Sequence, residues 1–201
     1  LPRTSYDECV DWICNLLDEA ASSLPAIRTN KEDYGLATSV GAKAVKAKML
    51  LYAASPLFNG NSSFYSNFTD KSGSQLMPLT YDPNKWVKAK TAIKEAIDLA
   101  EQNGHALYVK QDYKIGNEDA NPYPAAGPVR CLRTSLVDWD SRNPEVLLAE
   151  TRSEGSYGIQ NKSLPFVTDG WAWNGVGPTW TMLNRFYTKN GLPWDEDPEY
   201  K

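Results

Sequence analysis

The sequence has little histidine, few cysteines and no long apolar run. His105 is the one histidine among 201 residues, so a site built on several histidines is excluded. A Ser-His-Asp or Cys-His catalytic arrangement would depend on that residue alone. The three cysteines, Cys9, Cys14 and Cys131, form no CxxC pair, which excludes zinc-ribbon and thioredoxin-like sites. No stretch approaches the roughly 18 apolar residues of a membrane-spanning helix.

The numbers of basic and acidic residues in the sequence are nearly equal. Lys and Arg number 21 and Asp and Glu 25, which gives a net charge of -4. Because no basic block is present, binding of nucleic acid through its phosphates is not expected. The sequence also lacks a P-loop, a complete calcium loop and a local signature of paired catalytic carboxylates. We therefore expect no enzymatic activity, no cofactor and no metal site.

Apolar residues make up 41% of the chain, enough for a folded core. Their periodicity predicts three helices, at residues 5–24, 40–55 and 83–103. Ser5 and Glu8 form a capping box at the first start, and Pro25 and Pro56 end the first two helices. The lysines of the second helix, Lys43, Lys46 and Lys48, are expected on a solvated face. The expected core faces are Val10, Ile13, Leu17, Ala20 and Leu24; Ala44, Ala47, Leu51 and Ala54; and Trp86, Ala89, Ile93, Ala96, Ile97 and Ala100.

A shorter fourth helix is expected to open at Pro178 and to close at Asn190-Gly191, with Trp180, Leu183 and Phe186 towards the core. The run 145–150 fits a strand or a helical turn. The connections 56–82 and 105–177 are long, and such loops are usually functional or disordered. Their many aromatic residues favour order. The expected fold is therefore mainly α, with paired antiparallel helices that carry long ordered loops. A tetratricopeptide-like repeat is only weakly indicated, because the helix starts keep no strict period.

Residues 41–59, GAKAVKAKMLLYAASPLFN, resemble the signature helix of the SusD/RagB family. The flanking segments resemble that family in the same order along nearly the whole chain. These segments are residues 6–13 with 17–20, 86–100, 143–148, and 178–186 with 190–193.

The resemblance implies a SusD-like α superhelix. It also implies that residues 1–201 are one partial domain from inside a longer protein, without its N-terminal lipoprotein signal and C-terminal region. Members of the family are lipid-anchored on the outer face of the Bacteroidetes outer membrane. They pair with a SusC-like TonB-dependent transporter and capture glycans or other nutrients for import, without known chemistry of their own. An alternative is a tetratricopeptide-like module whose role is to dock onto that transporter.

Aromatic and amide side chains in residues 152–174 form the candidate ligand site. An indole buries the C–H face of a sugar ring, and amides and guanidinium groups bond its hydroxyls. In an extended chain Trp171 and Trp173 would point to one side. The sequence leaves open whether they bind a ligand or pin the loop to the helices. In the earlier loop, the aromatics Phe58, Phe64, Tyr65 and Phe68 are expected mainly in the core. The candidate ligand residues are Trp171, Trp173, Tyr157, Asn174, Arg152 and Asn161.

Overall fold

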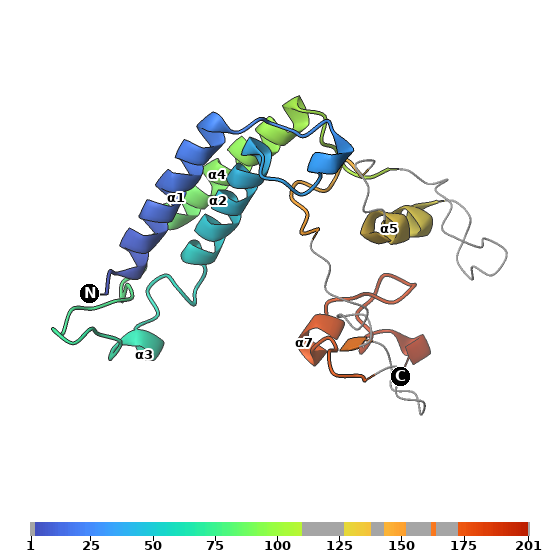
Figure 1. Ribbon diagram of the computed structural model, residues 1–201. Helices are drawn as coiled ribbons and strands as arrows, with labels where there is room; N and C mark the ends of the chain where they lie inside the picture. The colour runs from blue at the N-terminus through green and yellow to red at the C-terminus, as the bar shows by residue number, and fades with distance from the viewer. Residues whose placement is uncertain (1–2, 110–126, 138–142, 152–161, 164–172, 201) are drawn as a thin grey trace. The chain divides into compact units, whose positions relative to one another are not determined.

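The structure is a computed structural model that describes residues 3–109, 127–137, 143–151, 162–163 and 173–200. Within these ranges β pairing is limited to the isolated bridges Thr69–Gln75 and Tyr187–Pro193. The prediction of a mainly α fold is confirmed. The helices are α1 (Tyr6–Ser23), α2 (Ser39–Ala54), α3 (Ser62–Tyr65), α4 (Asn84–Gln102), α5 (Pro128–Val137) and α7 (Trp180–Leu183), with 3-10 turns at Lys31–Asp33 and Pro198–Tyr200 (Figure 1).

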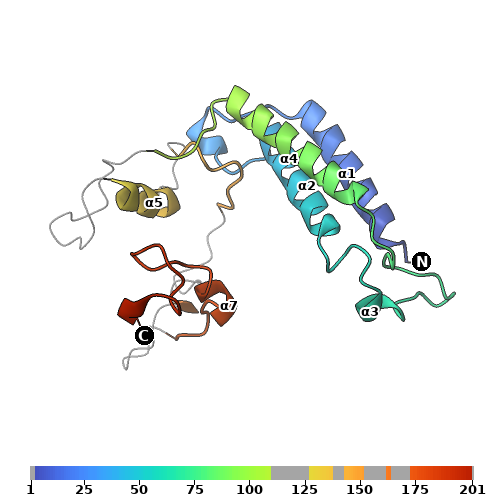
Figure 2. The same ribbon diagram turned by 180° about the vertical axis from the view of Figure 1, so that it is seen from behind.

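The chain divides into two compact units, Leu1–Thr151 and Arg152–Lys201. In the first unit α1, α2 and α4 lie side by side, and each runs antiparallel to the next, as Figure 1 and, from behind, Figure 2 show. Helix α2 packs against both α1 and α4. The antiparallel helix pairs expected from the sequence are therefore present.

Small residues form most of the core between the three helices. Val10 and Cys14 of α1 face a strip of α2 that contains Ala47, Leu50 and Ala53, and α4 adds Ala89, Ala92 and Ala96. Alanines at this seam let the helix axes approach closely. The buried alanines of α4 are Ala89, Ala92, Ala96 and Ala100.

Local capping fixes where the helices begin. Glu8 N donates to Ser5 Oγ and Ser5 N donates to Glu8 Oε2, at 3.4 and 3.2 Å, so the predicted capping box is confirmed. Helix α2 begins at Ser39, and its N-cap residue is Thr38, whose Oγ1 accepts from Gly41 N at 3.0 Å. These signals lie next to the helices in sequence, which is why the predicted starts agree with the structure to within one residue.

The faces of the helices differ in part from the prediction. In α2, Ala47 and Ala54 are buried as predicted, but Leu51 is exposed and Leu50 and Ala53 are buried instead. In α4 the large side chains of Trp86 and Ile97 are exposed, and Ala92 is buried instead. The close α2–α4 seam explains this outcome, because it has room for methyl groups and excludes indole and sec-butyl groups.

The prediction that the lysines of α2 are solvated is wrong for two of the three. Lys43 Nζ and Lys46 Nζ both donate to the carboxylate of Asp18 on α1. Lys43 also lies 3.8 Å from Glu95 of α4. Only Lys48 is exposed. These ion pairs join all three helices at one edge of the bundle.

The loop between α2 and α4 is anchored by Asn59, which is buried. Its Nδ2 donates to Asp82 O and its Oδ1 accepts from Asp82 N, both at 2.9 Å. The ring of Phe58 stacks on Tyr6 with centroids 5.3 Å apart. Phe64 and Phe68 are exposed, so the expected core role holds for the start of this loop only.

In the second unit, the expected fourth helix is shortened to one turn, α7. A hairpin follows it. Thr188 N donates to Leu192 O at 2.8 Å and Gly191 N donates to Thr188 O at 2.9 Å. Gly191 has φ +73, the left-handed conformation that closes a three-residue hairpin loop. Asn190-Gly191 therefore marks a β turn, not the end of a helix.

Candidate ligand-binding site

Two of the six predicted ligand residues, Trp173 and Asn174, lie in the described part of the chain. Trp173 exposes 47% of its surface. Asn174 has φ +46, a left-handed conformation that asparagine tolerates better than most residues. Gly175 N and Val176 N both donate to Lys162 O, at 2.8 and 2.9 Å, and hold the backbone after the indole. The other four candidates, Trp171, Tyr157, Arg152 and Asn161, lie outside the described residues.

The sequence led us to expect Trp180 in the core, and this prediction is wrong. It exposes 75% of its surface, and Leu183 and Phe186 are also exposed. The prediction assumed a helix long enough to form an apolar face, whereas α7 has only four residues. The indole of Trp180 is therefore available at the surface of this unit.

Trp194 is a surface indole with a fixed orientation. It exposes 48% of its area, and its Nε1 donates to Asn184 Oδ1 at 2.9 Å. The hairpin that carries it is held by the buried carboxylate of Asp197, which accepts from the Thr188 hydroxyl and from Asn190 Nδ2. The hydrogen bond from Thr188 is the main reason that the pKa of Asp197 lies below its ordinary value. Trp194 was not predicted as a ligand residue, because it stands beside an acidic run in the sequence.

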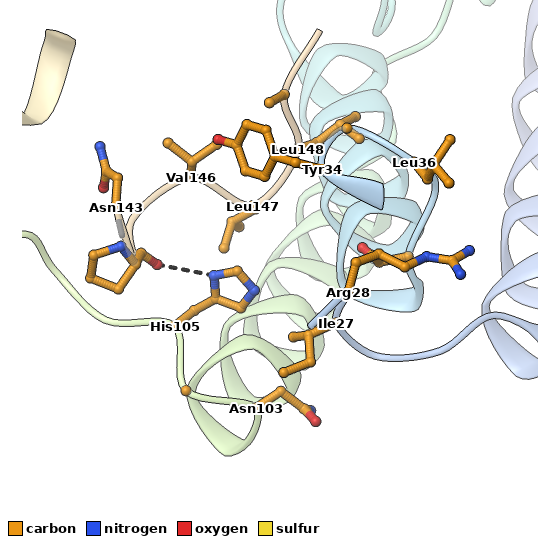
Figure 3. A pocket seen from close by; sticks show the side chains of 15 residues that line it. Ile27, Arg28, Tyr34, Leu36, Asn103, His105, Asn143, Val146, Leu147 and Leu148 are labelled. Atoms are coloured by element: carbon orange, nitrogen blue, oxygen red, sulfur yellow. Dashed lines mark hydrogen bonds between the residues drawn. The ribbon is translucent and has the colours of Figure 1, made fainter. Parts of the chain in front are cut away.

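The first unit contains a pocket of about 280 Å³. It lies between the loop of residues 27–38, the end of α4 at residues 103–105, and the segment 143–149 (Figure 3). Ile27, Leu36, Val146 and Leu147 provide apolar walls, and His105 provides a polar ring. We name this the His105 pocket.

Asn143 and Pro144 line one side of the His105 pocket, and Glu145, which follows them, helps to hold them in place. Asn143 Oδ1 accepts from Glu145 N at 3.0 Å and its Nδ2 donates to Ser135 O of α5 at 2.9 Å. Glu145 Oε2 accepts from Tyr108 N at 3.1 Å. The run 145–150 is thus neither a strand nor a helix. It is an irregular segment, pinned to the chain that follows α4.

Glycine permits two close contacts near the pocket. At Gly41 an added Cβ would lie 3.4 Å from Leu148 Cδ1, so the segment 147–148 rests on the start of α2. Gly35 has φ +90, and an added Cβ would lie 2.6 Å from Thr151 Oγ1. The two glycines thus let the segment 147–151 lie close to the start of α2 and to the loop that precedes it.

The His105 pocket was missed by the sequence analysis. Its walls are separated by tens of residues, and neither periodicity nor a motif links them. The one available signal was the sole histidine, placed directly after the Asn103-Gly104 end of a helix.

Within the described ranges, no group of three or more His, Cys, Asp or Glu side chains could hold a metal ion. Nor does any helix in these ranges combine the length and apolar character needed to cross a bilayer.

These features define a mainly α-helical protein with exposed indoles in its second unit and a small pocket in its first. Searches against models of protein families and against curated proteins find no match. A solved structure titled "BT4246" is similar, with 33% identity and a TM-score of 0.73 over 99% of this chain and 36% of that chain. Another, titled "selenomethionine BT4246", has 33% identity and a TM-score of 0.68 over 99% and 37%. The chain thus spans about a third of the length of the structures it matches.

Proposed function

We propose that the protein is a non-catalytic, carbohydrate-binding protein of the SusD/RagB type. It captures an oligosaccharide at the outer face of the outer membrane and passes it to a SusC-like TonB-dependent transporter. The observation that carries this proposal is the exposure of indole rings in the second unit. Trp173, Trp180 and Trp194 each leave about half or more of their surface open to solvent.

Exposed indoles suit a carbohydrate for a physical reason. A sugar ring presents a face of C–H groups that loses contact with water when it lies on an indole, while its hydroxyls at the edge stay hydrated. Three such rings in one unit would each add a modest contribution to binding. The family part of the proposal is supported by the resemblance of α2 and its flanking segments to SusD/RagB sequences.

A glycan array first identifies the oligosaccharides that bind the protein. A calorimetric titration then measures the affinity for each of them. Replacing Trp171 and Trp173 together with Ala should weaken binding by about 1–3 kcal/mol in total, or about 5- to 100-fold, because two stacking contacts are lost. Phe64→Ala is the matched control, since it removes an exposed aromatic ring from the first unit. It should leave the affinity unchanged.

Circular dichroism checks that both variants are folded. An unchanged affinity of the double variant would refute the proposed site. A reducing-sugar assay on the same glycans should stay at background, and release of sugar would refute the non-catalytic role.

A second candidate function is docking onto the transporter through the helices. It is favoured by apolar side chains on the outer face of the bundle, where Trp12 and Leu16 lie one turn apart on α1 and are exposed. The glycan titration separates the two functions, because a protein that only docks gives no heat with any glycan.

A further inference from the structure

We propose that the His105 pocket is a second ligand site, which takes one neutral, hydroxyl-bearing ring such as a monosaccharide or the terminal residue of a glycan. In this site a ligand hydroxyl donates to Nε2 of His105. The choice of a sugar rests on the proposed function, whereas the site itself is independent of Trp171 and Trp173.

The hydrogen bonding of His105 determines which nitrogen faces the ligand. Nδ1 lies 3.0 Å from Pro144 O, and a carbonyl oxygen only accepts, so Nδ1 carries the hydrogen. In the neutral ring Nε2 is then an acceptor. No hydrogen bond from a described residue reaches Nε2. Figure 3 shows the imidazole between the 143–149 segment on one side and Ile27 on the other.

The imidazole is held before any ligand arrives. Pro144 O also accepts from Ala106 N at 3.3 Å, and His105 N donates to Ala100 O at 3.0 Å at the end of α4. The ring and its carbonyl partner are therefore fixed by the same backbone contacts. A fixed acceptor loses little conformational entropy on binding.

The size and chemistry of the pocket select the class of ligand. A volume of about 280 Å³ lies at the lower end of the range for small-molecule sites, which suits one ring. The residues that line it include no carboxylate. Its permanent cation, Arg28, directs Nε and Nη2 at Ala37 O, at 3.3 and 3.0 Å. Apolar walls with the fixed acceptor of His105 among them favour a neutral ring that has both a C–H face and a hydroxyl.

The single histidine makes the pocket directly observable. The imidazole C–H signals in a proton NMR spectrum belong to His105 alone. The probes are the methyl glycosides of glucose, galactose, mannose, xylose and arabinose, titrated into the millimolar range where one-ring ligands bind. At least one should shift the His105 signals in a saturable way, and the shift should persist in the Trp171→Ala, Trp173→Ala variant.

Two substitutions test the role of Nε2. In His105→Asn the amide occupies the place of Nδ1, keeps the bond to Pro144 O and removes the acceptor. Binding, followed by saturation-transfer NMR of the glycoside, should weaken about three- to tenfold. In His105→Gln the amide oxygen reaches the place of Nε2 and should restore part of the affinity.

The proposal is overturned if no glycoside shifts the His105 signals, or if His105→Asn binds as well as the native protein. Sodium benzoate and cyclohexanol serve as competing probes, and a saturable response to benzoate alone would overturn the neutral-ligand class. If no glycoside shifts the His105 signals while glycan binding still depends on Trp171 and Trp173, this inference is refuted and the proposed function stands. If a glycoside shifts the His105 signals but the Trp171→Ala, Trp173→Ala variant binds glycan as well as the native protein does, only the tryptophan site is refuted.

Discussion

At the scale of single residues, Gly60 is the glycine of the described part of the chain where an added Cβ would meet the closest contact. Its φ is +82, and an added Cβ would lie 2.4 Å from Tyr81 N, a backbone atom that cannot swing away. It follows the buried Asn59, whose side chain holds the backbone of Asp82. The chain that leaves α2 and the chain that enters α4 therefore touch at a glycine, where any side chain would meet the backbone of Tyr81.

We predict that Gly60→Ala lowers the free energy of unfolding by clearly more than Gly73→Ala does. Both glycines have φ near +85, at +82 and +88, but Gly73 has open space around it. Gly73→Ala should cost only the left-handed conformation, about 1 kcal/mol. Gly60→Ala adds a backbone clash to that cost. Urea denaturation of the two variants measures the difference, and equal losses would show that the contact with Tyr81 yields easily.

The sequence predicted side chains well where the determinants are local and poorly where they are not. The Ser5–Glu8 box was predicted because both partners lie within one turn of the chain. The exposure of Trp180 was not, because it depends on how soon α7 ends. The contact of His105 with Pro144 spans 39 residues, so no local pattern contains it.

At the scale of elements, Asp18 joins α1 to α2. Burial alone would raise the pKa of this carboxyl, but the hydrogen bonds from Lys43 and Lys46 outweigh burial and set the pKa below its ordinary value. The bond with Asp18 raises the pKa of Lys43 in turn. The folded state therefore holds the charged pair more strongly than the unfolded chain does.

The lowered pKa of Asp18 predicts a loss of stability in acid. A carboxyl whose pKa is depressed on folding stabilises the protein above its unfolded pKa, near 3.8, and loses that contribution as the pH falls through the folded pKa. At neutral pH Asp18→Asn should cost about 0.5–1 kcal/mol, since the carboxylate is partly exposed. The gap between the two proteins should shrink as the pH is lowered from about 5 to about 3.

Denaturant unfolding at several pH values measures this gap. Glu19→Gln is the control, because it removes a neighbouring exposed carboxyl that makes no described ion pair. A gap that stays constant down to the lowest pH would contradict the assignment.

The three long helices could be predicted from the sequence, whereas α3 and α5 could not. Proline and capping residues delimit α1, α2 and α4, and their apolar periodicity extends over four turns or more. Helix α3 has four residues, too few for any period to be visible. Helix α5 has ten, and it stands in a connection that contains several prolines and glycines. Its hydrogen bonds to the rest of the unit, between Ser135 and Asn143 and between Cys131 and Tyr108, are tertiary contacts.

At the scale of the whole molecule, the division into two compact units has an energetic consequence. Contacts are concentrated inside Leu1–Thr151 and inside Arg152–Lys201. Each unit also has its own anchor: an alanine-rich seam between three helices in the first, and the buried carboxylate of Asp197 in the second. Damage to one anchor should therefore stay within its own unit, because distant sites without shared partners act nearly independently.

We predict that Asp197→Ala loosens the second unit alone. The substitution removes the acceptor of the Thr188 hydroxyl, of Asn190 Nδ2 and of Glu199 N. Hydrogen exchange followed by mass spectrometry should show lost protection in residues 186–200 and unchanged protection in α1, α2 and α4. Asp195→Ala is the matched control, since it removes an exposed carboxylate two residues away. Faster exchange in α1, α2 and α4 of Asp197→Ala would mean that the units depend on each other for stability. Substitutions at the exposed tryptophans of the second unit could then also disturb the His105 pocket.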